Sequence, residues 1–279
     1  MPELDSRVLF AFLLTLAAGL STGIGSLLGL LNRRFSPRVL TLSLSFSAGV
    51  MLYVSFVEIF PKARLSLSAA LGPSLGYGVT VLAFFAGIAA IALIDRLLPN
   101  HDALIAPALQ GGLAEGEPLP AAARTRSQSE LMRTGLFSAL AIGIHNFPEG
   151  LATFLGALSS PRLGIGIAIA IAIHNIPEGL AVSAPIHYAT GSKRKAFWIS
   201  LGSGLAEPLG AVVGYVFLGS VLNDAVMGLV FASVAGVMIY ICLDELLPTA
   251  QRMASHHHLM ISGVLAGMVV MSLSLVLPA

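Results

Sequence analysis

Two copies of one polar motif interrupt apolar stretches of the chain, HNFPEG at 145–150 and HNIPEG at 174–179. Each copy places a histidine and a glutamate four residues apart, so on a helix both lie on one face, one turn apart. The asparagine after the histidine lies about 100° around the helix from it. Each helix therefore offers imidazole nitrogen, amide oxygen and carboxylate oxygen to one side. This ligand set suits divalent transition metals such as Zn²⁺, Fe²⁺, Mn²⁺ and Co²⁺.

Prolines accompany these polar residues. Pro148 and Pro177 each remove a backbone donor and free the carbonyl four residues earlier, which predicts a kinked helix. Loosened backbone at membrane depth is tolerated where it lines a wet cavity enclosed by protein. A further acid, Glu207, is followed by Pro208 at a similar predicted depth. We therefore expect the two motifs and Glu207 to line one cavity.

The charges of this cavity need a partner. An ionised side chain at the centre of a membrane costs about 2.5–3.5 kcal/mol even on a lenient scale. Glu149, Glu178 and Glu207 would carry three negative charges, and no lysine or arginine lies in their predicted helices. Bound cations or protons must compensate, and two divalent ions would nearly balance the site. A single buried histidine or glutamate is more often a packing element, but two identical constellations with a third acid favour a binding site.

The composition places these motifs in a membrane. Apolar residues make up 56% of the 279 residues and charged residues 10%, with a mean hydropathy of +0.88. These values predict a polytopic membrane protein. A net charge of +1 gives no sign of a nucleic-acid partner. The one cysteine, Cys242, excludes an internal disulfide framework and a cysteine-based metal cage, and we interpret it as a packing residue.

Eight stretches are long and apolar enough to span a bilayer, which needs about 20 residues for each helix. They are approximately 8–31, 39–60, 74–94, 134–158, 163–187, 196–220, 225–247 and 259–277. The first follows an acidic leader, MPELDSR, and we expect it to be a true span rather than a cleaved signal peptide. The polar break at 95–133 is interpreted as a flexible cytoplasmic connection. Residues 1–279 are therefore expected to form a single transmembrane transporter domain.

The positive charges predict the orientation of these spans. Of the 15 lysines and arginines, only Arg7, Lys62, Arg64 and Arg162 lie on the side of the N-terminus. Because cytoplasmic loops carry the excess of positive residues, both termini should be periplasmic or extracellular. The expected location is the cell inner (plasma) membrane.

Internal repeats indicate how the spans are arranged. AGVMLYVSFVEIFPKA (48–63) aligns without gaps on AGVMIYICLDELLPTA (235–250), and GLSTGIGSLLG (19–29) matches GLAEPLGAVVG (204–214) more weakly. Helices five spans apart cross the membrane in opposite directions, so these are inverted repeats. The predicted fold class is an all-α integral membrane protein with eight transmembrane helices in a 3+2+3 inverted-repeat arrangement. Secondary transporters are built in this way, with sites near the midplane.

Other candidate residues have weaker support. Glu58 and Glu245 are expected near helix ends, and the sequence leaves open whether they contact an ion path. If they do, Glu58 belongs at the outer mouth and Glu245 at the inner mouth. The paired methionines and tyrosines of the long repeat, Met51, Met238, Tyr53 and Tyr240, are interpreted as packing or interface residues. The run His256, His257 and His258 is a metal-affinity pattern on a short cytoplasmic loop, and a role for it in relaying metal is the less favoured interpretation.

The motifs together resemble those of the ZIP family of metal-ion transporters, most closely the bacterial ZupT type. The resemblance covers nearly the whole chain, including HNIPEGLAV and ATGSKR at 189–194. It implies a binuclear centre shared by the fourth, fifth and sixth spans, with seven ligands: His145, Asn146, Glu149, His174, Asn175, Glu178 and Glu207. In this family the two motif glutamates bridge the ions, histidine-rich coordination forms one site, and the asparagines with the sixth-span acid form the other.

The same resemblance implies the cargo. The expected substrates are Zn²⁺ and Fe²⁺, with Mn²⁺, Co²⁺ and Cd²⁺ as further candidates, and no prosthetic group is expected. Many relatives carry a histidine-rich loop between the third and fourth spans. Here that loop holds only His101, so we do not expect it to sense metal. The partners are metal ions and lipid, and the sequence leaves a homodimer open.

Two other classes were weighed against a transporter. An intramembrane metalloprotease would need HExxH, which the chain lacks, so we do not expect an enzyme. A passive cation channel also uses carboxylates and kinked helices. Saturable flux would indicate a carrier, whereas a very high unitary conductance would indicate a channel.

Overall fold

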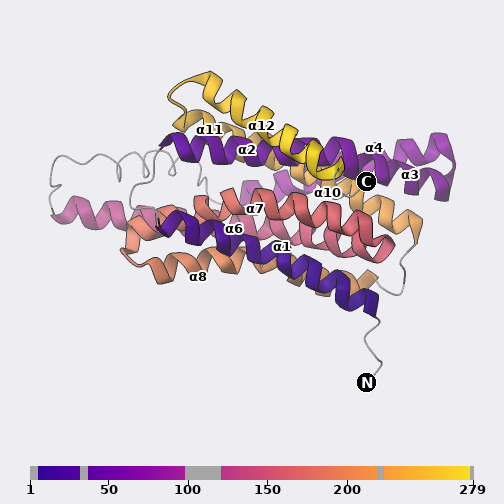
Figure 1. Ribbon diagram of the computed structural model, residues 1–279, viewed down its shortest axis with the longest axis horizontal. Coiled ribbons are helices and arrows are strands. Elements are labelled where there is room, and N and C mark those ends of the chain that lie inside the picture. The colour runs from indigo at the N-terminus through magenta and orange to yellow at the C-terminus, as the bar shows by residue number, and fades with distance from the viewer. Residues whose placement is uncertain (1–5, 32–36, 98–120, 219–220, 222, 277–279) are drawn as a thin grey trace.

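The structure is a computed structural model that describes residues 6–31, 37–97, 121–218, 221 and 223–276. All regular secondary structure in these residues is helical, and the long helices lie roughly along one axis (Figure 1). The α-helices are α1 (Ser6–Leu31), α2 (Pro37–Val54), α3 (Phe60–Leu71), α4 (Pro73–Leu97), α6 (Ala121–Ser159), α7 (Pro161–Thr190), α8 (Lys193–Gly204), α9 (Ala206–Val213), α10 (Asp224–Ile241), α11 (Leu247–Met253) and α12 (His257–Val276). Three π-helical turns join them: η1 (Ser55–Ile59), η2 (Gly214–Leu218) and η3 (Cys242–Leu246). The all-helical class is confirmed.

Seven helical stretches of the described chain are long and apolar enough to cross a membrane. They are Ser6–Leu31, Arg38–Leu71, Pro73–Arg96, Pro161–Ala184, Lys193–Leu218, Asp224–Met253 and His257–Leu275, and each contains most of one predicted span. The eighth predicted span falls in α6, which is not among the seven. Its middle holds His145, Asn146, Pro148 and Glu149, and these polar residues lower its hydropathy. The structure is that of an integral membrane protein.

Helix α6 begins earlier than the sequence predicts. It starts at Ala121, so residues 121–133, expected to be part of a flexible connection, are helical. Their sequence is rich in alanine, arginine, glutamine, glutamate and leucine, which favour helix, and the glycines and prolines of the connection come before Ala121. Residues 98–120 of the predicted connection, including His101, lie outside the described residues.

Two π-turns carry helices past a proline. The amide of Phe60 donates to the carbonyl of Ser55, five residues earlier, and the amide of Leu247 donates to the carbonyl of Cys242 in the same way. A proline follows each turn, and the extra residue shifts the hydrogen-bond register so that the helix continues. As a result, α2, η1 and α3 form one rod, as do α10, η3 and α11.

This continuity corrects one expectation. Glu58 lies in η1 and Glu245 lies in η3, both inside long helical rods. The prediction that these two acids sit near helix ends is wrong. The predicted spans end at residues 60 and 247, whereas the π-turns carry both helices past the prolines that follow.

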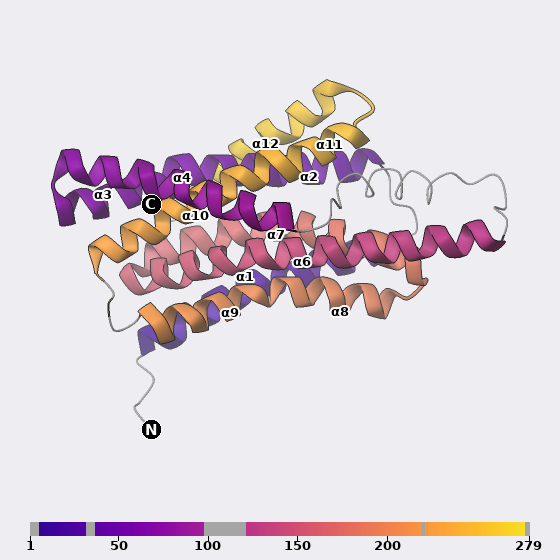
Figure 2. The same ribbon diagram turned by 180° about the vertical axis from the view of Figure 1, so that it is seen from behind.

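The bundle has three layers, with α6 and α7 in the middle (Figures 1 and 2). On one side α1 packs along α7, and α8 and α9 pack along α6. On the other side α2 packs with α12, and α10 packs with α4, while α2 also contacts α7 and α10 contacts α6. The middle layer is therefore enclosed on two sides, and it carries both polar motifs.

Glycines let the outer helices approach closely. A Cβ on Gly49 of α2 would overlap the carbonyl oxygen of Val264 in α12, and one on Gly236 of α10 would overlap that of Phe84 in α4. Small residues at such crossings are typical of membrane helices, because dispersion contacts between backbones replace the hydrophobic effect.

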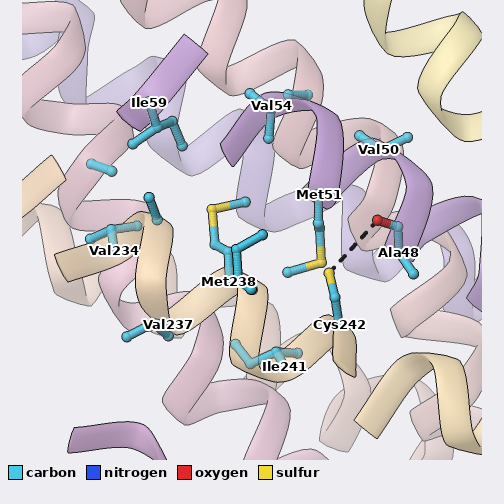
Figure 3. Packing of buried hydrophobic residues seen from close by; sticks show 14 of the residues in the cluster. Ala48, Val50, Met51, Val54, Ile59, Val234, Val237, Met238, Ile241 and Cys242 are labelled. Atoms are coloured by element: carbon cyan, nitrogen blue, oxygen red, sulfur yellow. Dashed lines mark hydrogen bonds between the residues drawn. The ribbon is translucent and has the colours of Figure 1, made fainter. Parts of the chain in front are cut away.

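A sulfur-rich cluster fills the core between α2 and α10 (Figure 3). Met51, Met238 and Cys242 are fully buried, and Figure 3 shows the sulfur atoms of Met51 and Cys242 beside each other. The Cys242 thiol lies 3.7 Å from the carbonyl oxygen of Ala48, and the Ser55 hydroxyl lies 3.6 Å from the Met238 sulfur. The packing role predicted for Met51, Met238 and Cys242 is confirmed.

Both ends of the described chain lie toward one end of the bundle. Helix α1 begins and α12 ends on the side where α3 meets α4 (Figure 1). Helix α6 begins at the opposite end and projects beyond its neighbours (Figure 2). The N-terminal start of α6 therefore marks the other face of the membrane domain.

Candidate functional site

Polar side chains of the two motifs meet where α6, α7 and α9 come together, deep in the bundle. Six of the seven predicted ligands have no more than 4% of their surface exposed: Asn146, Glu149, His174, Asn175, Glu178 and Glu207. The spacing within each motif places the histidine and glutamate one turn apart, and the packing of α6 on α7 brings the two copies together. The structure thus gathers residues that are far apart in the sequence.

The glycine that ends each motif explains how the neighbouring helices come so close. A Cβ on Gly150 would overlap the backbone of Glu207 in α9, and one on Gly179 would overlap the carbonyl oxygen of Thr22 in α1. Any larger residue would push these helices away. The motif glycines therefore position the acid of α9 against α6, and α1 against α7.

One contact joins the two motifs directly. The Nε2 atom of His174 in α7 lies 3.1 Å from the Oε2 atom of Glu149 in α6. Both side chains are almost fully buried, so water cannot compete for this contact.

A second contact joins the α7 motif to Glu207. The Asn175 amide donates to Glu207 Oε1 and to the carbonyl oxygen of Ala18, the latter at 3.1 Å. The Asn146 amide donates to the carbonyl oxygen of Ser203 at 3.2 Å. Both amide groups are thus held in place, and their oxygens remain as acceptors.

Span six is broken next to Glu207, between α8 and α9. Pro208 has no amide hydrogen, and in a helix its ring would clash with the carbonyl four residues earlier, at Gly204, where α8 ends. Glu207 therefore lies in the first turn of α9.

His145 lies apart from the other six. Its Nδ1 atom is 3.4 Å from Oε2 of Glu245 in η3, and both side chains are slightly exposed, at 12% and 15%. The structure places Glu245 beside a motif histidine, although the sequence left its role open. The repeat alignment with Glu58 was the only sequence signal for it.

A hydrogen bond also joins a tyrosine of α10 to an acid of α4. The Tyr240 hydroxyl donates to Asp95 Oδ2 of α4 at 3.3 Å. Tyr240 therefore links α10 to α4 through a hydrogen bond as well as through packing.

Several buried acceptors in the cluster have no donor among the described residues. They are Asn146 Oδ1, Glu149 Oε1, Asn175 Oδ1, Glu178 Oε2 and Glu207 Oε2. A buried polar atom without a partner costs about 1–3 kcal/mol, and more when it is charged. No lysine or arginine occurs between Arg162 and Lys193, or between Lys195 and Arg252. The cluster is rich in acceptors and poor in positive charge, so it suits a cation.

The ligands are paired rather than assembled into a complete metal site. Within the described residues, no group of three histidine, cysteine, aspartate or glutamate side chains is placed to hold a metal ion. His174 is turned to Glu149 and His145 to Glu245. A bound ion would therefore have to replace these contacts by rotation of the side chains.

The remaining candidates lie outside this cluster. His256, His257 and His258 are exposed at the start of α12. Glu58 lines a separate pocket that also contains Lys62 and Arg162.

The chain matches known sequences over the region that carries these residues. A model of the family described as ZIP Zinc transporter matches residues 113–275, which include both motifs and Glu207. The Zinc transporter ZupT of Chlorobium chlorochromatii is 57% identical over 278 residues, covering 98% of this chain and 99% of the relative. That of Chlorobaculum parvum is 56% identical over 274 residues, with 98% and 99% covered. That of Clostridium perfringens is 51% identical over 278 residues, with 98% and 97% covered.

The family match accounts for more than half of the chain, and the relatives align along almost all of it. A buried, acceptor-rich cluster inside a membrane bundle is the kind of site that a cation transporter needs. This chain belongs to the ZIP family of metal-ion transporters and resembles its bacterial ZupT members.

Proposed function

We propose that this protein carries divalent transition-metal ions across the membrane, with zinc as its main cargo. The ions bind between α6, α7 and α9. The observation that carries this proposal is the set of buried oxygen acceptors without a donor, in a region with no lysine or arginine. Membership of the ZIP family and its relatives' description as zinc transporters support zinc.

Two ions share the site. Glu149 and Glu178 bridge them, His145 and His174 belong to one ion, and Asn146, Asn175 and Glu207 belong to the other. Two observed contacts support this division: Glu149 lies against His174, and Asn175 lies against Glu207. Carboxylate, amide and imidazole ligands together also accept Fe²⁺, Mn²⁺, Co²⁺ and Cd²⁺.

Glu245 extends this line of ligands toward the cytoplasm. It contacts His145, which lies one helical turn from Glu149, nearer the end where α6 begins. An ion leaving the central site therefore meets His145 and Glu245 next. This assignment keeps Glu245 on the inner side of the path, although not at a helix end.

The architecture proposed for this transport is the 3+2+3 inverted repeat. Matching pairs of helices pack alike: α1 on α7 corresponds to α8 and α9 on α6, and α2 with α12 corresponds to α10 with α4. The π-turns η1 and η3 fall at aligned positions of the repeat, as do Gly49 and Gly236 at the helix crossings. The whole chain acts as one transport domain. Every proposed ligand comes from one chain, so the proposal holds equally for a monomer and for a homodimer.

The domain is placed in the inner membrane with both termini outside. Cysteines that replace Glu58 and Glu245 test this placement in a background in which Cys242 is changed to serine. A membrane-impermeant thiol reagent added outside intact cells should label position 58 and spare position 245. Labelling of position 245 from outside would refute the orientation.

Uptake by purified protein in vesicles tests the transport function. Radiolabelled zinc should enter with saturable kinetics, and unlabelled iron, manganese, cobalt and cadmium should compete with it. Glu178→Ala should abolish uptake, because the variant lacks a bridging carboxylate. Asp224→Asn, which changes an exposed acid in the first turn of α10, serves as control and should keep the wild-type rate. Wild-type uptake by folded Glu178→Ala would refute the assignment, and non-saturating flux of high conductance would indicate a channel.

A further inference from the structure

A polar pocket of about 440 Å³ lies at the end of the bundle where α6 turns into α7. Its volume is within the range of small-molecule sites. Its polar lining residues are Glu58, Lys62, Ser66, Ser159, Ser160 and Arg162. In the proposed orientation this end faces the outside, so metal ions arriving for uptake would meet this pocket.

Three charged side chains line the pocket: Glu58, Lys62 and Arg162. Lys62 and Arg162 are exposed and Glu58 is half-buried. No ion pair involves any of these three side chains within the described part of the chain. Two cations and one carboxylate give this pocket a net charge of +1.

Groups that favour anions surround these cations. Helix α7 begins at Pro161, and the hydroxyl of Ser160, its N-cap residue, makes no capping hydrogen bond. The first amides of α7 and the serine hydroxyls can therefore donate to a ligand. Together with Lys62 and Arg162 they form a lining suited to carboxylate oxygens.

This lining is unfavourable for a bare divalent ion. Lys62 and Arg162 repel a free Zn²⁺, and only Glu58 attracts it. A metal ion that arrives with a small polycarboxylate, such as citrate, satisfies all three groups. In such a complex the two cations would hold the free carboxylates of the chelate, and the Glu58 carboxylate would face the metal.

We propose that this outer pocket receives divalent metal as a complex with a small polycarboxylate. Glu58 then takes the metal by ligand exchange. One bond from the metal to a chelate oxygen breaks as a bond to the Glu58 carboxylate forms, and Lys62 and Arg162 retain the released carboxylate. This inference rests on the proposed transport function and names the chemical form in which the cargo reaches the protein.

The carboxylate of Glu58 distinguishes this ligand from a lipid headgroup. A phospholipid phosphate could also bind Lys62 and Arg162, but Glu58 would repel it. A metal chelate has a positive centre within an anionic shell, so it makes use of the carboxylate as well as of the cations.

Binding of radiolabelled citrate to purified, metal-free protein in detergent tests the pocket without transport. Changing both Lys62 and Arg162 to alanine should weaken citrate binding about tenfold, since two exposed charge contacts are lost. Glu58→Gln should strengthen it, because a repelling charge is removed. Arg64→Ala is the matched control, because Arg64 stacks over the Tyr77 ring at 4.7 Å and does not line the pocket.

Uptake into vesicles at a fixed concentration of free zinc tests the role of the pocket. Adding citrate should raise the wild-type rate but not that of the variant lacking Lys62 and Arg162. That variant should keep its uptake of free zinc. Glu58→Gln should bind citrate more tightly and yet take up zinc more slowly from zinc citrate.

The two proposals fail in different ways. If the wild type takes up zinc neither as the free ion nor as the citrate complex, the transport function is refuted. The citrate-binding measurement still tests the pocket in that case. Two results would overturn the pocket assignment. One is a wild-type uptake rate that depends only on the concentration of free zinc. The other is citrate binding that is unchanged in the variant lacking Lys62 and Arg162. Displacement of citrate by phosphatidylglycerol, with no effect of citrate on uptake, would assign the pocket to lipid headgroups and also overturn it.

Discussion

The contact between Glu149 and His174 gives the sharpest prediction about metal affinity. Glu149 is 1% exposed, its Oε2 atom lies 3.1 Å from His174 Nε2, and its Oε1 atom has no donor within the described residues. Glu149→Gln keeps the size of the side chain and removes its charge. The proposed bridging role makes this carboxylate a ligand to both ions.

The size of the effect follows from the burial of the site. Removing one partner of a buried charged pair costs about 3–5 kcal/mol, because the other charge remains uncompensated. Each 1.4 kcal/mol corresponds to a factor of about ten in affinity. Zinc affinity of Glu149→Gln should therefore fall by about two to three and a half orders of magnitude. Competition with a chromophoric chelator on the purified protein measures this loss.

A double-mutant cycle tests whether the two residues act on the same ion. If they do, the losses in Glu149→Gln and His174→Gln should not add, because each change already disables the shared site. Thermal unfolding of the metal-free variants separates a folding defect from lost binding. Zinc affinity of folded Glu149→Gln within about threefold of wild type, or strictly additive losses, would refute the reasoning.

Three further predictions concern packing, selectivity and protons. Gly87→Ala should lower the free energy of unfolding by about 1–3 kcal/mol, because its Cβ would overlap the carbonyl oxygen of Ser233. Gly78→Ala on the same helix is the control: its Cβ meets open space, so the free energy of unfolding should not fall. Thermal melts of both variants measure the difference. His145→Ala should keep some flux and shift the preference away from zinc, since imidazole is the softer ligand, and loss of all flux in competitive uptake would contradict this. As the medium is acidified, zinc affinity should fall and more protons should be released on zinc binding, because carboxylates and imidazoles must lose their protons to bind the ion. Titration calorimetry in buffers of different ionisation enthalpy measures both quantities. A zinc affinity that stays constant across the mildly acidic range would count against the proposed ligands.

The core of the site was predictable because the motif is short, repeated and helical. Spacing by four residues fixed the relative positions of His174 and Glu178 before any packing was known. The absence of lysine and arginine from the predicted motif spans, 134–158 and 163–187, predicted a cavity that lacks positive charge. The apolar lengths predicted the membrane bundle, and the structure contains seven such spans in its described residues.

Other features depend on packing and could not be read from the sequence. Pro61 and Pro248 indicate helix ends in isolation, but a single extra residue in each π-turn lets the helix continue. That shift places Glu245 against His145. A pairing of this kind depends on the rotation of α10 against α6, and no local pattern specifies it.

The proposed metal centre can be tested most directly by crystals of the protein grown with zinc. Anomalous diffraction at the zinc absorption edge locates each ion independently of any assumption about its ligands. We expect two peaks between α6, α7 and α9, one close to Glu149 and His174 and the other close to Asn175 and Glu207, both lost in Glu178→Ala. Peaks found only at the exposed histidines 256–258, or an unchanged pattern in the variant, would contradict the proposed centre.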